Sequence, residues 1–253
     1  MLSFTEYGDA SPDRPPLIIA HGLYGSGRNW GVIAKRLSDT RRVITPDMRN
    51  HGTSPLEPTQ SYEDMAADLA GLIRHIGGPV DLCGHSMGGK AAMVLALTHP
   101  DLLRRLIVAD IAPVPYSHSQ SHHIKAMRAV DLSTVTRRSD AAEQLGAKGV
   151  EPALQSFFTQ SLDVSARHWR LNLDVLEAEM DKIIGFPQLT GSFDKPTLFL
   201  TGADSNYVRP EHRPLIKSLF PAARFAKLPG AGHWLHADRP REFEAALRTY
   251  FDA

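Results

Sequence analysis

Ser86 is the residue of this 253-residue chain whose setting best suits nucleophilic chemistry. It stands at the centre of the sequence GHSMG, residues 84–88, which is a G-x-S-x-G pattern. This pattern places a serine at a tight turn between a strand and a helix, where the neighbouring residues must be small. The pattern is short enough to occur by chance, but here it follows the apolar residues 80–83 and precedes the helical sequence GGKAAMVLALT. We therefore predict that Ser86 is displayed at the carboxyl edge of a sheet.

A serine hydroxyl needs a general base at neutral pH, and the chain offers twelve histidines. His233 lies in the glycine-rich sequence GAGHW, residues 230–234, between a predicted strand and the final predicted helix. A loop in this place emerges at the carboxyl edge of the sheet, and its glycines let it bend toward Ser86. These features indicate His233 as the base. His85, next to Ser86, points in another direction at such a turn, and we predict a packing and hydrogen-bonding role for it.

Acyl transfer passes through a tetrahedral oxyanion, which backbone N–H groups stabilise. One predicted donor is the N–H of Met87, the residue after the nucleophile. The other is the N–H of Leu23, in the loop HGLYG at residues 21–25 that follows the first apolar strand. His21 is expected to hold this loop in place. The sequence DMRNHGTS, residues 47–54, is interpreted as a structural, hydrogen-bonded turn.

The acid that orients the catalytic histidine has two candidates. Asp110 ends the predicted strand 106–109, and Asp204 follows the predicted strand 197–200 in the sequence GADSNYV. Both strands end at the same edge of the predicted sheet, so position alone leaves the choice open. Asp174 lies within a helical pattern and is expected on the surface.

Short apolar runs alternate with amphipathic segments along most of the chain. The predicted strands are residues 17–20, 42–45, 80–83, 106–109, 197–200 and 225–228. The predicted helices between and after them are residues 29–37, 61–76, 87–98, 210–219 and 242–251. This alternation predicts an α/β fold, with a mostly parallel central sheet and helices on both of its faces.

The alternation stops between residues 113 and 196, where the sequence shows no convincing strand. Helices are expected there at residues 121–130, 140–148, 152–161 and 167–184. We interpret residues 113–196 as a helical lid inserted into a core made of residues 1–112 and 197–253. A substrate pocket is expected between this lid and Ser86, with apolar lining from Tyr24, Met87, Trp169 and Trp234.

The composition narrows the possible partners and compartments. Lys and Arg number 28, as do Asp and Glu, so the net charge of zero gives no reason to expect nucleic acid or an anionic membrane as a partner. The single cysteine, Cys83, excludes an intrachain disulfide and is expected to be buried. His118, His122 and His123 are expected to be solvated rather than to bind a metal. The chain shows no secretory signal and no apolar run of ~18 residues, so we expect a cytoplasmic protein without a membrane span.

Together these motifs resemble the α/β-hydrolase superfamily over nearly the whole chain. The matching sequences are AHGLYGS, DMRNHGTS, GHSMGGK, TLFLTGADSNYV and GAGHWLHADRP. The combination of GHSMGGKAAM, VADIAPVPY and GHWLHADRP is similar to the small bacterial carboxylesterases and their mitochondrial α/β-hydrolase relatives. In much of the superfamily the acid follows the penultimate strand, but Ser205 occupies that position here. In the narrower esterase group the aspartate of the VADIAPV segment serves instead, so the resemblance implies Asp110.

The resemblance implies a serine hydrolase with a Ser86–His233–Asp110 triad, which cleaves carboxylic esters or thioesters through an acyl-enzyme. The apolar lining favours small-molecule substrates with short to medium acyl chains, and no cofactor or metal is expected. C–C bond hydrolysis and perhydrolysis use the same triad and remain alternatives. A non-catalytic small-molecule receptor is a further alternative, because fold alone does not determine function.

Overall fold

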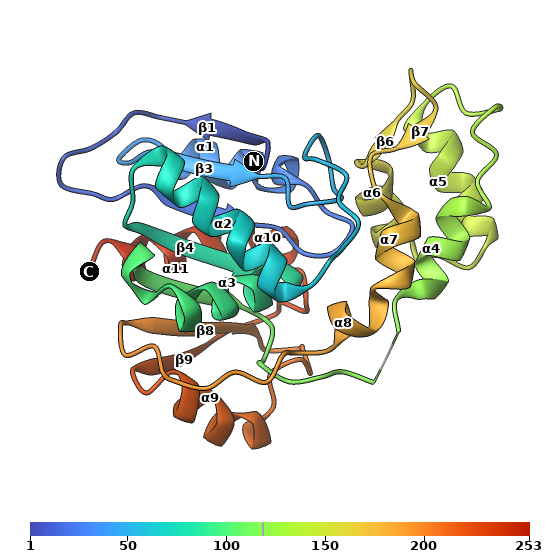
Figure 1. Ribbon diagram of the computed structural model, residues 1–253. Helices are drawn as coiled ribbons and strands as arrows, with labels where there is room; N and C mark the ends of the chain where they lie inside the picture. Colours follow the sequence, from blue (N-terminus) through green and yellow to red (C-terminus); the bar gives the residue numbers. More distant parts are fainter. Residues whose placement is uncertain (118) are drawn as a thin grey trace.

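A seven-stranded sheet forms the centre of the computed structural model, which describes residues 1–117 and 119–253 (Figure 1). Its strands lie in the order β1-β3-β2-β4-β5-β8-β9. The strands are β1 (Phe4–Tyr7), β2 (Leu17–Ala20), β3 (Val43–Pro46), β4 (Val80–His85), β5 (Leu103–Ala109), β8 (Thr197–Gly202) and β9 (Ala223–Leu228). β1 runs antiparallel to β3, and the other neighbouring strands of this sheet are parallel. The prediction of a mostly parallel sheet is therefore confirmed.

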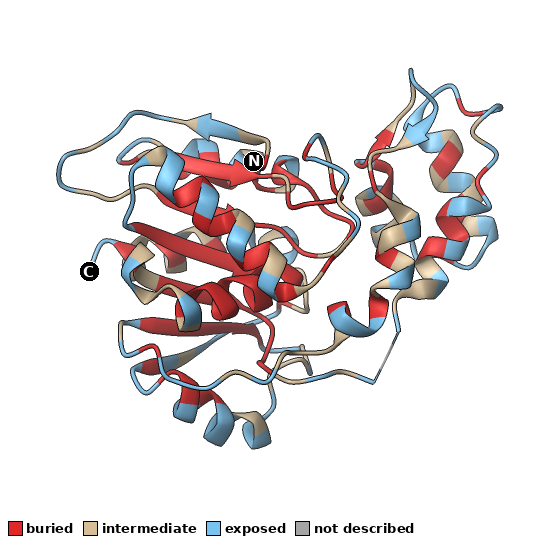
Figure 2. Ribbon diagram, viewed as in Figure 1, coloured by how far each residue is buried: buried red, intermediate tan, exposed pale blue. Residues whose placement is uncertain are grey.

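Helices cover both faces of the sheet, as predicted. One face packs against α2 (Tyr62–Ile76), α3 (Met87–Thr98) and α9 (Arg213–Leu219), and the other against α1 (Gly31–Leu37), α10 (Leu235–Asp238) and α11 (Pro240–Phe251). Successive strand residues point to opposite faces, so in β2 Ile18 enters the first apolar layer and Ile19 the second. Both layers are closed to solvent, and the central strands are buried along their length (Figure 2).

The predicted helices of the core form close to their expected limits. α2 begins after Ser61, whose hydroxyl accepts the N–H of Asp64 at 3.1 Å, and it ends at Gly77 with a φ of 85°. The helix expected at residues 29–37 is a 3₁₀ turn, η1 (Gly27–Trp30), continued by α1. Two more 3₁₀ turns, η2 (Pro100–Leu102) and η3 (Pro210–His212), precede β5 and α9.

The structure contains one core strand that the sequence analysis did not predict. β1 pairs Phe4 with Pro46 and Tyr7 with Val43 at the edge of the sheet. Its residues are half-buried or exposed, in contrast to the buried residues of β2 and β3. An edge strand with one neighbour carries little of the apolar signal that marks a central strand, which explains why β1 was missed.

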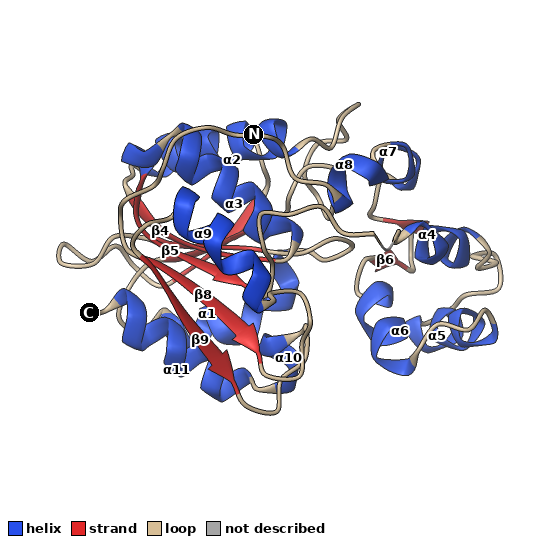
Figure 3. Cartoon of the chain, turned by 90° about the horizontal axis from the view of Figure 1, so that it is seen from below, coloured by secondary structure: helices blue, strands red, loops and turns tan. Residues whose placement is uncertain are grey.

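Residues 113–196 leave the sheet after β5 and return at β8. Their elements are α4 (Ser121–Arg128), α5 (Arg138–Ala147), α6 (Pro152–Thr159), β6 (Leu162–Asp163), β7 (His168–Trp169), α7 (Leu173–Ala178) and α8 (Met180–Ile184). The segment stands beyond the edge of the sheet toward which the arrows of β8 and β9 point (Figure 3). His118 belongs to this segment but lies outside the described residues.

Two expectations for this segment are wrong. It does contain strands, because β6 and β7 pair as a short antiparallel hairpin. The single helix expected at residues 167–184 is also interrupted. Arg167 has a φ of 53°, and α7 begins only after Asn172, whose side chain accepts the N–H of Val175 at 3.4 Å. The turn at Arg167 and the cap at Asn172 therefore replace the first part of the predicted helix.

Within the part of the chain that the structure describes, no helix is both long and apolar enough to cross a bilayer. Cys83 is fully buried in β4, as expected, and burial raises the pKa of its thiol.

Candidate active site

Ser86 occupies the strained turn that the sequence pattern predicts. It lies between the end of β4 and the start of α3 with φ 52° and ψ −117°, a conformation that non-glycine residues rarely adopt. The turn is possible because the chain packs closely around it: a Cβ on Gly84 would lie 2.4 Å from the Gly88 carbonyl oxygen, and one on Gly88 would lie 2.6 Å from that of Ala20. The two glycines of the motif are therefore required by contact distances.

Asp110 and His233 meet at the carboxyl edge of the sheet. Nδ1 of His233 lies 2.8 Å from Oδ2 of Asp110, and Asp110 is fully buried. The other carboxylate oxygen, Oδ1, accepts the backbone N–H of Gly202 at 3.0 Å. The hydroxyl of Ser205 donates to Oδ2, the oxygen that also contacts His233. The Gly202 N–H and the Ser205 hydroxyl thus hold the buried carboxylate against the imidazole.

His233 is held by two further contacts, one to its ring and one to its backbone. The ring of Tyr207 stacks on it, with centroids 3.9 Å apart and an angle of 18° between the planes. The side chain of His85 donates from Nε2 to the His233 carbonyl oxygen at 2.8 Å. Burial lowers the pKa of His85 far below its usual range, so this ring stays neutral beside the site. His85 thus supports the backbone of the loop that carries His233.

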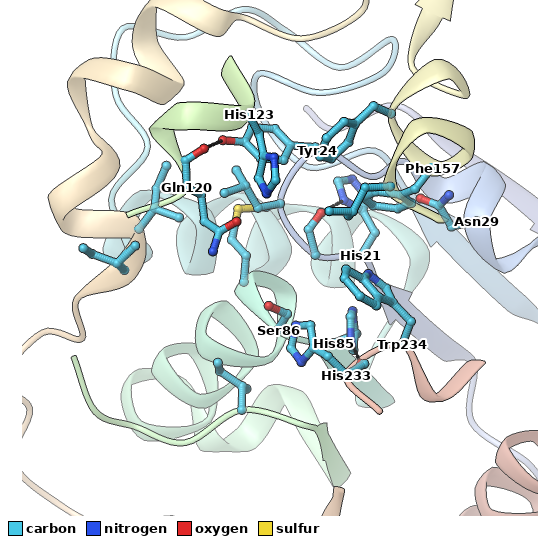
Figure 4. Close-up of a pocket in the computed structure, with 18 of the residues that line it drawn as sticks. His21, Tyr24, Asn29, His85, Ser86, Gln120, His123, Phe157, His233 and Trp234 are labelled. Carbon is cyan, nitrogen blue, oxygen red and sulfur yellow. Dashed lines mark hydrogen bonds between the residues drawn. The ribbon is translucent and has the colours of Figure 1, made fainter. Parts of the chain in front are cut away.

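Ser86 and His233 face one cavity of about 530 Å³ between the sheet edge and residues 113–196 (Figure 4). Its walls are mainly apolar and aromatic, with Leu23, Tyr24, Met87, Ile111, Leu154, Phe157, Phe158, Ile183, Ile184 and Trp234 among the lining residues. Within the described part of the chain, the Ser86 hydroxyl donates to no protein group. The hydrogen bond between serine and base is often open without substrate, so this arrangement is compatible with a catalytic pair.

The two residues predicted to supply the oxyanion donors, Leu23 and Met87, lie in the wall of the same cavity as Ser86. Among the described residues, neither N–H is donated to a protein acceptor. The loop that carries Leu23 is fixed on both sides. Nε2 of His21 accepts the N–H of Met48 at 2.9 Å, and Nε2 of His51 accepts the N–H of Tyr24 at 3.1 Å.

The turn at residues 47–54 carries the groups that hold the Leu23 loop in place, and it is a hydrogen-bonded turn, as predicted. Asp47 accepts the N–H groups of Gly27 and Thr53, each at 2.8 Å. His21 and His51 are buried with ring centroids 5.1 Å apart, and burial lowers the pKa of both. Neutral imidazoles therefore position the Leu23 loop.

The structure separates the two candidate acids. Asp110 contacts His233, whereas the side chain of Asp204 is exposed and the Asp204 N–H donates to the Ala231 carbonyl oxygen at 3.0 Å. Asp174 is also at the surface, with 90% of its side chain exposed in an ion pair with Arg128. Among the described residues, neither Asp204 nor Asp174 forms a hydrogen bond or ion pair with His233.

The predicted pocket lining is correct for three of four residues. Tyr24, Met87 and Trp234 line the cavity, but Trp169 does not; its indole N–H donates to the Met127 carbonyl oxygen at 3.0 Å. Trp169 lies in the β6–β7 hairpin rather than in the predicted helix, and its indole is held against α4. His122 is exposed as expected. His123 is instead half-buried in the cavity wall, and burial lowers its pKa to about 4.

Lys90 is a buried cavity residue that the sequence analysis did not identify. It lies one turn after Ser86 on α3, is 2% exposed and donates from Nζ to the carbonyl oxygens of Ile184, at 2.9 Å, and Gly185. Burial lowers the pKa of Lys90 to about 7. Its sequence GGKAAM reads as part of an apolar helix, which is buried over residues 87–96. Only the position of Lys90 one turn after the nucleophile could have indicated its role.

Ser205 and Tyr207 are two further contacts of the site without an assigned role from the sequence. Ser205 was noted only because it occupies the position of the acid in related proteins. Its hydroxyl contact with Asp110 depends on the path of the loop after β8, which no local pattern reveals. The stacking of Tyr207 on His233 likewise joins residues from two separate loops.

Comparison with known proteins places the chain among hydrolases. A family model described as the alpha/beta hydrolase fold matches residues 15–240. The chain is 44% identical to the sn-1-specific diacylglycerol lipase ABHD11 of Mus musculus, over 96% of this chain and 82% of that protein. It is 37% identical to Esterase YbfF of Escherichia coli K12, over 94% of this chain and 93% of that protein. A solved structure, titled "Marine microorganism esterase", superposes with a TM-score of 0.92 at 38% identity and covers 98% of each chain.

The buried amine of Lys90 predicts a specific dependence of stability on pH. Its pKa is about 7 in the folded protein and 10.5 when unperturbed, so between these values the unfolded chain binds a proton that the folded chain lacks. The free energy of unfolding therefore rises with pH across this window, by at most about 1.4 kcal/mol per pH unit. Lys90→Met removes this contribution. Urea unfolding at pH 7.5 and 9 measures the free energy of unfolding of wild type and Lys90→Met. The same change in this free energy between the two pH values in both proteins would contradict the prediction.

Proposed function

Because the chain belongs to the α/β-hydrolase family and is a hydrolase of the esterase and lipase type, we propose that Ser86, His233 and Asp110 form its catalytic triad. The substrate class that fits is a carboxylic ester or thioester of short to medium acyl chain. The observation that carries the proposal is the contact of His233 with buried Asp110 at the cavity that also contains the strained Ser86.

In the first step, the oxygen of Ser86 attacks the acyl carbonyl carbon while Nε2 of His233 takes the hydroxyl proton. The contact between Nδ1 and Asp110 supports this role, because it assigns the N–H to Nδ1 and leaves Nε2 as the acceptor. The N–H groups of Leu23 and Met87 stabilise the oxyanion that forms on the carbonyl oxygen. The imidazolium is stabilised by the Asp110 carboxylate.

In the second step, the carbonyl re-forms and the bond to the alcohol or thiol breaks. His233 transfers its proton to the leaving group, and the acyl group remains as an ester on Ser86. A water molecule then donates a proton to Nε2 and attacks the acyl-enzyme through a second oxyanion. Collapse of this intermediate releases the carboxylic acid and returns the proton to Ser86.

Residues 113–196 act in this proposal as a lid that completes the substrate pocket. The segment contributes Leu154, Phe157, Phe158 and Ile184 to the cavity, opposite Ser86 on the core. A cavity of about 530 Å³ is within the usual range for small-molecule sites and supports acyl chains of short to medium length. The mouse relative is named a diacylglycerol lipase, which makes acylglycerols worth testing beside simple esters.

Loss of the nucleophile tests the proposal directly. Wild type should hydrolyse a p-nitrophenyl acyl series with saturation kinetics, whereas Ser86→Ala should lose about 10⁴-fold or more in kcat, because no acyl-enzyme can form. The measurement is release of p-nitrophenolate from acetate to decanoate esters, with circular dichroism to establish that the variant is folded. Equal rates in both proteins would exclude Ser86 as the nucleophile.

The two aspartates provide a matched pair for the acid. Asp110→Asn should lower kcat by up to about 10⁴-fold, because an amide cannot hold the same imidazole tautomer or stabilise the imidazolium. Asp204→Asn should retain wild-type kcat, since Asp204 is exposed and the contact to His233 is made by Asp110. Steady-state hydrolysis of p-nitrophenyl butyrate measures kcat for both variants. Loss of activity in Asp204→Asn with an active Asp110→Asn would reverse the assignment.

A further inference from the structure

The carboxyl end of α8 is held by side chains from the core of the protein. The final carbonyl groups of a helix have no partner within the helix. Here Lys90 donates to the carbonyl oxygens of Ile184 and Gly185, and the hydroxyl of Tyr62 donates to that of Ile183. The backbone N–H of Tyr116 adds a second donor to Ile184 at 3.0 Å. We call Lys90, Tyr62 and these carbonyl groups the α8 clamp.

The two side chains of the clamp are buried among aromatic rings. Nζ of Lys90 lies 4.7 Å from the ring centroid of Tyr116 and 5.6 Å from that of Tyr62. Tyr62 is 2% exposed, and burial raises the pKa of both tyrosines, so their hydroxyls stay protonated. Among the described residues, no carboxylate forms an ion pair with Lys90. A buried amine is costly unless its hydrogen bonds are made, so the carbonyl groups of α8 account for its position.

The clamp joins the proposed nucleophile to the proposed lid through one helix. Lys90 is four residues after Ser86 on α3, and its N–H donates to the Ser86 carbonyl oxygen at 3.0 Å. On the other side, α8 is the last helix of the segment before the chain returns to β8. Ile183 and Ile184 carry the clamped carbonyl groups, and both line the cavity. The clamp therefore sets the distance between this apolar wall and the strained turn at Ser86.

We propose that Lys90 is a positioning residue that determines acyl-chain selectivity by holding the Ile183–Ile184 wall against the nucleophile helix. This inference rests on the proposed esterase function, because it assigns the clamped wall to the part of the cavity that receives the acyl chain. Release of the clamp lets the end of α8 move outward, which enlarges the cavity for longer chains. Short chains do not reach the wall and are affected less.

The test is the ratio of kcat/KM for p-nitrophenyl octanoate to that for p-nitrophenyl butyrate. Lys90→Met keeps an unbranched side chain but removes the amine. In this variant the ratio should rise about tenfold, which is the size of effect that a small change in a hydrophobic pocket has on selectivity. Tyr62→Phe keeps its ring and removes only the hydroxyl, and its ratio should rise in the same direction by less. The matched control is Lys195→Met: Lys195 also donates to two backbone carbonyls, those of Pro100 and Leu103, and it does not line the cavity.

An unchanged ratio in Lys90→Met and Tyr62→Phe would overturn the inference, as would an equal rise in Lys195→Met. If Lys90→Met does not fold, Tyr62→Phe decides the result alone. Hydrogen–deuterium exchange at residues 180–186 supplies a readout without turnover, and it should be faster in both clamp variants but not in Lys195→Met. A wild type that hydrolyses no ester would refute the proposed function, whereas unchanged exchange in the clamp variants would refute the clamp itself.

Discussion

The close approach of backbone to backbone at the Ser86 turn is the constraint on which the rest of the site depends. Gly84, at the end of β4, lies against Gly88 in the first turn of α3, and Gly88 lies against the carbonyl groups that end β2. This packing forces Ser86 into its positive φ and places it above the sheet edge. It also brings the loop after β2 to the start of α3, where the N–H groups of Leu23 and Met87 line one cavity. A side chain larger than hydrogen at either glycine would separate these elements.

A parallel sheet makes the remaining contacts possible, because its strands end at the same edge. Asp110 follows β5, Ser205 follows β8 and His233 follows β9, and these strands are consecutive neighbours in the sheet. Their loops therefore converge on the carboxylate of Asp110. Ser205 reaches this carboxylate although it lies more than ninety positions later in the sequence. Residues 113–196 supply further lining of the cavity, and their last helix, α8, accepts a hydrogen bond from Lys90 on α3, the helix that starts directly after Ser86.

Much of this arrangement could be predicted from the sequence, and the failures have physical causes. The buried strands and the turn at Ser86 were predictable because apolar periodicity and closely spaced glycines are local signals. Local signals did not separate Asp110 from Asp204, because both end strands at the same edge and only the loop path decides which carboxylate reaches His233; the family resemblance alone favoured Asp110. The contacts of Ser205 and Tyr207 with the site depend on the same path. The break before α7 was missed because a turn at Arg167 carries no glycine or proline to mark it.

Covalent labelling of the native enzyme tests the central claim, that Ser86 is activated as a nucleophile by its surroundings, most directly. The protein would be incubated with an alkyl fluorophosphonate, which reacts with activated serines, and then digested and mapped by mass spectrometry. The account predicts one label per chain, on Ser86, with loss of hydrolytic activity in proportion to labelling. A fully labelled protein that retains its activity, or an inactivated protein with its label on another residue, would contradict it.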